Sequence, residues 1–111
     1  MTIDELLAEH TDDVAALASR LIAHLSDAAD WADTRVWPGW HGIGFHHGDA
    51  GYVVGVFPRR DRVQILFEHG HFLGDAPFLE GEGQTRTIEF TDWDEDRLGV
   101  VDDLLDRALG T

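Results

Sequence analysis

The sequence predicts an α+β fold, in which N-terminal helices and a C-terminal helix pack on one face of an antiparallel sheet of four to five strands. Three observations predict it. Apolar residues recur at helical spacing near both ends of the chain. Short apolar or alternating runs fill the middle. The connections between these runs are too short for parallel pairing, which needs a crossover of about a dozen residues. The 111 residues fit one domain, residues 1–111.

The segment from Thr2 to about Ala29 predicts a short helix followed by a longer one. Thr2 and Glu5 have the spacing of a capping box at the start of the first helix, and Thr11 can cap the second. The longer helix then presents one apolar stripe to the core. This stripe consists of Val14, Leu17, Ala18, Leu21, Ile22 and Leu25.

The middle of the chain predicts five strands, separated by turns rich in Gly, Pro, Arg and Asp. They are expected at Asp33–Trp37, Gly42–His46, Tyr52–Phe57, Val63–Glu68 and Arg86–Phe90. The stretch from His69 to Gln84 is irregular, with one turn of helix expected around Ala76–Leu79.

The last segment predicts a helix. Asp92 is expected as its N-cap, with Glu95 three residues later completing a capping box. Gly110 fits the position just after the helix. The expected buried stripe consists of Leu98, Val101, Leu104, Leu105, Ala108 and Leu109.

Composition excludes several classes of function. The net charge is −14, which repels phosphate backbones and anionic lipid, so neither nucleic acid nor a membrane surface is expected as a partner. The absence of cysteine removes disulfides, thiolate catalysis and cysteine-ligated metals. Met1–Glu5 is polar and acidic, so no signal peptide is expected, and no apolar run is long enough to span a membrane. These features favour the cytoplasm.

The second half of the chain carries a recognisable pattern. Residues Val63–Pro77 form a strand followed by a Phe, Gly, Leu and Pro pattern, and Leu79–Arg86 forms a Leu-Glu-Gly-x-Gly turn that ends in arginine. From Tyr52 to Leu109 the chain resembles the YdhG-like family of domains of unknown function. The family often has Lys where this chain has Gln84, so any role for a cation there would pass to Arg86 or be lost.

The resemblance implies one functional hypothesis. Because the family includes a frataxin-like intracellular iron chaperone, iron or another divalent cation becomes a candidate partner. This implication is an analogy at the level of the fold, since function depends on the site and not on the fold.

The seven histidines provide candidate metal ligands. His69 and His71 flank Gly70, and in an extended segment they would share one face and could bind one cation together. His41, His46 and His47 cluster around the second predicted strand. The alternative interpretation is that all of these are surface or half-buried histidines without a ligand.

Aromatic residues provide a second candidate site. Gly42 and Gly44 leave part of one strand face without side chains, so a ligand could approach there. Trp37, Trp40 and His41 would line the resulting cleft. The alternative is that a helix or an aromatic ring of the protein fills this space. The full set of candidate ligand-binding residues is Trp37, Trp40, His41, Phe45, His47 and Arg86.

Catalytic motifs are weak. Ser19 and Ser26 are the only serines, and neither has the sequence context of a nucleophile elbow. The sequence therefore favours a small binding or accessory domain without catalytic activity or cofactor, whose partner is a small molecule or a protein. The alternatives are a frataxin-like metal-binding protein and a homodimer that pairs an exposed edge strand.

Overall fold

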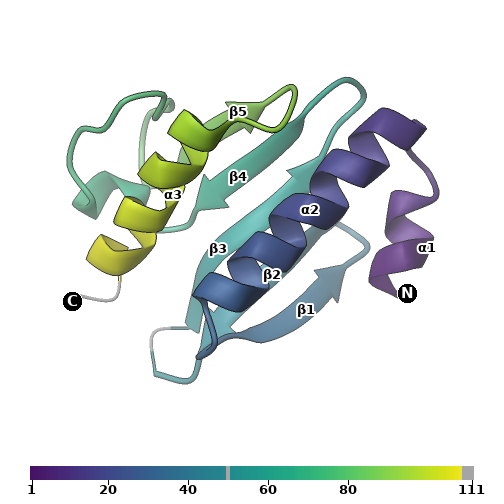
Figure 1. Cartoon of the computed structure of the whole chain (residues 1–111). Coiled ribbons are helices and arrows are strands. Elements are labelled where there is room, and N and C mark those ends of the chain that lie inside the picture. The colour runs from purple at the N-terminus through teal and green to yellow at the C-terminus, as the bar shows by residue number, and fades with distance from the viewer. Residues whose placement is uncertain (50, 109–111) are drawn as a thin grey trace.

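The computed structural model describes residues 1–49 and 51–108. Helices α1 (Ile3–Leu7) and α2 (Asp12–Ala28) precede the sheet, and α3 (Glu95–Ala108) follows it (Figure 1). Each strand of the sheet pairs antiparallel with its neighbours, in the order β1-β2-β3-β4-β5. The strands are β1 (Asp33–Trp37), β2 (Gly42–His47), β3 (Gly51–Pro58), β4 (Val63–Phe67) and β5 (Arg86–Phe90). The predicted α+β class is confirmed.

The molecule has two layers. Helices α2 and α3 lie on one face of the sheet, α2 over the strands that include β3 and α3 over β5 (Figure 1). Helix α1 packs against α2. No helix among the described residues covers the opposite face, which we call the helix-free face.

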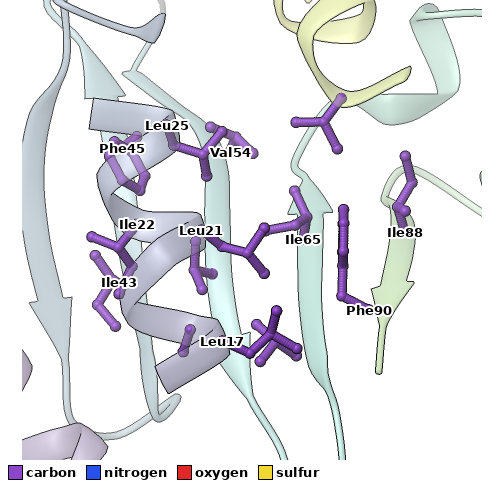
Figure 2. Close-up of a cluster of buried hydrophobic side chains, with 14 of the residues drawn as sticks. Leu17, Leu21, Ile22, Leu25, Ile43, Phe45, Val54, Ile65, Ile88 and Phe90 are labelled. Carbon is purple, nitrogen blue, oxygen red and sulfur yellow. The ribbon is translucent and has the colours of Figure 1, made fainter. Parts of the chain in front are cut away.

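The core lies between the helices and the sheet. Figure 2 shows leucine and isoleucine side chains of α2 directed at aliphatic and aromatic side chains of the strands. Strands β2, β4 and β5 contribute alternate residues, as the period of two in a strand requires. The fully buried residues from the strands include Ile43, Phe45, Val54, Val56, Ile65, Phe67, Ile88 and Phe90.

The predicted start of the first helix is confirmed. The Glu5 amide donates to the Thr2 hydroxyl, and the Thr2 amide donates to the Glu5 carboxylate, each over 3.1 Å. The Thr11 hydroxyl accepts from the Val14 amide at the start of α2. All six residues of the predicted α2 stripe are buried.

The predicted N-cap of α3 is wrong by two residues. The Asp94 carboxylate, not that of Asp92, accepts the Arg97 amide over 3.1 Å. The reason is that the Glu95 side chain accepts from the Trp93 indole N–H over 2.8 Å, so it does not reach back to complete a box with Asp92. Leu109 and Gly110, predicted in and after this helix, lie outside the described residues.

The expected turn of helix around Ala76–Leu79 is wrong. A short 3₁₀ helix, η1, lies earlier at Gly70–Phe72, and residues 77 and 78 form a turn. Phe78 has a φ of 65°. A left-handed backbone at this position cannot continue a right-handed helix.

A bulge in the β2–β3 pair changes which face one residue occupies. Phe45 pairs with Val54, but the next residue, His46, pairs with Tyr52, which leaves Val53 as an extra residue on β3. Val53 and Val54 both join the buried core. The extra residue directs Tyr52 to the helix-free face, where its ring contacts His46.

Candidate functional site

Three glycines allow aromatic rings to lie close to the helix-free face. A Cβ atom at Gly42 would fall 2.4 Å from the Phe57 ring, and one at Gly44 would fall 2.6 Å from the Trp37 indole. A Cβ at Gly55 would fall 2.5 Å from the Tyr52 hydroxyl. The space above Gly42 and Gly44 is therefore filled by the protein's own rings, which was the alternative considered from the sequence.

Trp37 is the centre of this arrangement. Its ring centroid lies 4.6 Å from that of Tyr52, 5.0 Å from that of His46 and 5.1 Å from that of Trp40, and all three rings are nearly perpendicular to it. Edge-to-face packing of this kind is the favoured geometry for aromatic pairs. We call Trp37, Trp40, His46, Tyr52 and Phe57 the aromatic cluster.

Two hollows lie beside Trp40, whose side chain is 66% exposed. One has a volume of about 480 Å³ and is lined by Trp40 together with Arg35, Trp37 and His46. The other has a volume of about 300 Å³ and is lined by Trp40 together with Tyr52, Phe57, Arg59, Leu66 and Glu68. An exposed indole between two hollows offers both of them a flat apolar wall.

One lining residue of each hollow carries a buried polar atom. His46 Nε2 and the Tyr52 hydroxyl are buried and have no hydrogen-bond partner among the described residues. Such groups lose about 1–3 kcal/mol of solvation when they are left unsatisfied. A third atom in this state, Glu89 Oε2, differs because it lies 3.3 Å from the Arg62 Nε. Because both atoms are buried, a ligand can add a hydrogen bond to either one only when a neighbouring ring shifts and exposes it.

The surroundings keep both of these groups neutral. Burial lowers the pKa of His46, and the nearby Arg35 charge lowers it further, while Asp33 opposes the change. Burial also raises the pKa of Tyr52 well above its ordinary value, and the negative charge of Glu68 adds to this. The cluster thus offers an uncharged imidazole and a protonated phenol, and both of these groups can form hydrogen bonds.

The charge of the sequence is distributed unevenly. Residues 31–70, which include β1 to β4, contain four arginines and four acidic residues. The rest of the chain contains four arginines and 18 acidic residues. The strands of the aromatic cluster therefore come from a neutral part of a strongly acidic chain, so they do not repel an uncharged or weakly anionic ligand.

Another hollow, of about 360 Å³, lies between α3 and the segment that contains η1, and is lined in part by His69, Phe72 and Arg107. The Arg107 guanidinium already has partners, since it donates to the Leu73 carbonyl over 3.0 Å and pairs with Asp103 over 2.6 Å. Tyr52 of the aromatic cluster also lines this hollow, so the hollow borders the cluster at that residue.

The predicted ligand-binding residues do not all lie together. Trp37 and Trp40 belong to the aromatic cluster, as expected. Phe45 is fully buried against the helices, on the opposite face of the sheet. His41 lies in the turn after β1, where its Nε2 contacts His10.

His47 and Arg86 also lie away from the cluster. The His47 Nδ1 accepts from the Asp49 amide, and its ring lies 5.6 Å from that of Trp31. The Arg86 guanidinium donates to the carbonyls of Gly83 and Thr85. Arg86 therefore holds the turn that precedes its own strand.

The backbone expected for the histidine pair is wrong. His71 lies in η1, not in an extended segment, and His69 precedes it in a turn. Both contact Gln84: His71 Nδ1 lies 2.9 Å from its carbonyl oxygen, and His69 Nδ1 lies 3.3 Å from its amide nitrogen. The Gln84 amide also donates to Glu68. Within residues 1–49 and 51–108, no group of three or more His, Cys, Asp or Glu could hold a metal ion.

The sequence did not identify Tyr52 as a site residue. In a regular strand Tyr52 would share the face of Val54 and Val56 and point into the core. Only the bulge places it beside His46, and nothing in the local sequence of β3 marks that bulge. His46 was noticed as part of a histidine cluster, but its burial beneath Trp37 depends on the sheet.

Comparisons of the chain with family models, curated proteins and solved structures found no match. The resemblance to the YdhG-like family therefore stays a prediction. In the described part of the chain, none of the helices has the length and apolar character that crossing a membrane requires.

Proposed function

We propose that the protein is a non-catalytic binding domain, and that its helix-free face binds a small planar organic molecule beside Trp40. The observation that carries this proposal is the pair of buried polar atoms, His46 Nε2 and the Tyr52 hydroxyl, which lack partners among the described residues. Their residues line two hollows that share Trp40. A planar ligand stacks on the indole, and its polar atoms bond to one or both of these groups.

Two further features support binding without catalysis. Burial raises the pKa of the Tyr52 phenol well above its ordinary value, whereas a general acid or base needs a pKa near the working pH. Arg35 pairs with Asp33 at the rim of the larger hollow, and Arg59 packs over Phe57 at the smaller one. Asp33 and Glu68 balance these cations at the two hollows, which suits an uncharged or weakly charged ligand, in a domain that we expect to act in the cytoplasm.

A fragment screen tests the proposal. Planar heteroaromatic fragments are added to the protein, and binding is followed by tryptophan emission and by chemical shifts of the strand amides. Fragments should shift the amides of β2 and β3, and Trp40→Ala should weaken their binding by tenfold or more. Tyr52→Phe removes only the hydroxyl, so it should weaken the binding of polar fragments selectively. Arg107→Gln, in the third hollow, is the matched control and should leave fragment binding unchanged.

Two results would overturn the proposal. One is that no fragment shifts the amides of the helix-free face. The other is that Trp40→Ala and Tyr52→Phe bind every fragment as tightly as the unmodified protein does.

A second candidate function, self-association, rests on strand β1. This strand ends the sheet order and pairs only with β2, so its outer edge presents backbone groups that a second copy of the chain could pair with. Light scattering across a wide concentration range tests this candidate. A dimer that Val36→Pro converts to a monomer would support it, because proline removes a backbone donor from the edge. A monomer at every concentration would exclude it.

A further inference from the structure

Two histidines from distant parts of the chain meet beside the turn between β1 and β2. His10 lies between α1 and α2, and His41 lies in the turn between β1 and β2. Their Nε2 atoms are 2.5 Å apart, and their ring centroids are 4.8 Å apart. This separation is shorter than the ordinary range of hydrogen bonds to nitrogen donors. Both side chains are half-buried.

The backbone fixes both histidines in place. The His10 amide donates to the Leu7 carbonyl, and the following residue, Thr11, caps α2. His41 has a φ of 56°, a left-handed conformation that is uncommon and strained for residues other than glycine. The His41 amide donates to the Pro38 carbonyl over 3.2 Å. The fold thus maintains an unfavourable backbone conformation at the residue that faces His10.

A carboxylate supports one of the two rings. Glu9 Oε2 lies 3.7 Å from His41 Nδ1, the nitrogen that faces away from His10. A proton on Nδ1 is favoured by this charge, and it leaves the Nε2 lone pair directed at His10. In histidines that bind metals the other ring nitrogen commonly donates to a carboxylate, and Glu9 lies on that side of His41, although beyond hydrogen-bond distance.

We propose that His10 and His41 form a two-histidine binding site for a borderline divalent cation such as Zn²⁺, Ni²⁺ or Cu²⁺. Imidazole nitrogens suit these metals. Metal–nitrogen bonds of about 2.0–2.1 Å place two ligand nitrogens about 2.9–3.4 Å apart. The two Nε2 atoms therefore need to move apart by only roughly 0.4–0.9 Å from their present separation to accept the metal.

The site is open. Since the described residues include no group of three or more such side chains around one point, water or an external ligand completes the coordination. The site is also independent of the proposed function, because it uses no residue of the aromatic cluster.

Calorimetric titration of the full chain with ZnCl₂ and NiCl₂ tests this proposal, with MgCl₂ as the hard cation that imidazole does not favour. One equivalent of Zn²⁺ or Ni²⁺ should bind, and His10→Ala should weaken binding by tenfold or more. His41→Asn should do the same, and asparagine tolerates the left-handed backbone at this position. The double variant His69→Ala/His71→Ala removes as many histidines elsewhere and is the matched control, which should bind like the unmodified protein.

Two further measurements distinguish a metal site from a hydrogen bond shared by the two rings. The electron paramagnetic resonance spectrum of bound Cu²⁺ should show coupling to two imidazole nitrogens, and His10→Ala should remove one of them. Glu9→Gln should weaken Zn²⁺ binding by up to about tenfold without abolishing it. Circular dichroism confirms that each variant is folded.

The proposal is overturned if the unmodified protein binds neither metal at concentrations up to about 1 mM. It is also overturned if folded His10→Ala and His41→Asn bind as tightly as the unmodified chain. Loss of binding in the His69→Ala/His71→Ala control alone would place the metal elsewhere and would equally exclude this site.

Discussion

The Phe57 ring lies so close to Gly42 that a Cβ atom at position 42 would fall 2.4 Å from its Cδ1 and Cε1 atoms. Phe57 is only 5% exposed, so its ring cannot move aside freely. Gly42→Ala should therefore lower the free energy of unfolding by about 1–3 kcal/mol, the usual cost of overpacking. Urea denaturation measures this change. Gly39→Ala, where no atom lies within 4 Å of the added carbon, is the control, and equal stability of the two variants would contradict the packing described.

The half-buried imidazole of His46 predicts a loss of stability in mild acid. Its pKa is lowered in the folded protein, so as the pH falls below about 6.5 the unfolded chain binds a proton before the folded protein does. The contribution of the neutral His46 to stability is fully present above that pH. It is lost as the pH falls through the pKa that His46 has in the folded protein, which is lower. His46→Gln should therefore lose less stability than the unmodified protein between pH 7 and pH 5.

Urea denaturation at a series of pH values checks this expectation for His46. His69→Gln removes an exposed histidine instead and serves as the control for composition. If His46→Gln and the unmodified protein show the same dependence on pH, the burial of His46 does not control stability.

The N-cap of α3 can be tested with two neighbouring substitutions. Asp94→Ala removes the carboxylate that accepts the Arg97 amide, so it should cost about 1 kcal/mol of stability, within a range of roughly 0.5–2. Asp92→Ala should change stability far less, since Asp92 is exposed. Asp94→Asn keeps an accepting oxygen and should recover most of the loss. Thermal unfolding distinguishes these variants. A larger loss of stability in Asp92→Ala than in Asp94→Ala would show that Asp92 is the N-cap, as expected from the sequence.

Gly99 offers a stabilising substitution. It lies within α3, it is exposed, and nothing lies within 4 Å of the position of an added Cβ. Gly99→Ala should raise the free energy of unfolding by about 0.5–1 kcal/mol, because alanine loses less conformational freedom than glycine in a helix. A rise in the urea midpoint at unchanged slope would show this effect. A fall in stability would mean that position 99 contacts another part of the protein.

The helices were the most predictable part of the fold. The α2 stripe from Val14 to Leu25 and the capping box of Thr2 and Glu5 depend on spacing within a few residues, so the sequence alone determined them. The cap of α3 was misplaced because two aspartates compete for it, and the Trp93–Glu95 hydrogen bond cannot be inferred from spacing.

The candidate site was only partly predictable. Trp37 and Trp40 stood out because they flank a glycine-rich strand, and both do lie in the aromatic cluster. Phe45 did not belong with them, because period two in β2 places it opposite Gly44 and His46, in the core. Tyr52 was missed because its direction depends on the bulge at Val53.

By itself, the sequence determined the fold class, the two-layer arrangement and the acidic character of this protein, because hydrophobic period and composition are local properties of the chain. The tertiary structure decided which rings cover the glycines, that Tyr52 lies beside His46, and that His10 meets His41 although they are 31 positions apart in the sequence. These contacts depend on strand register and on a bulge, and a shift of one residue in register reverses the face of every side chain that follows.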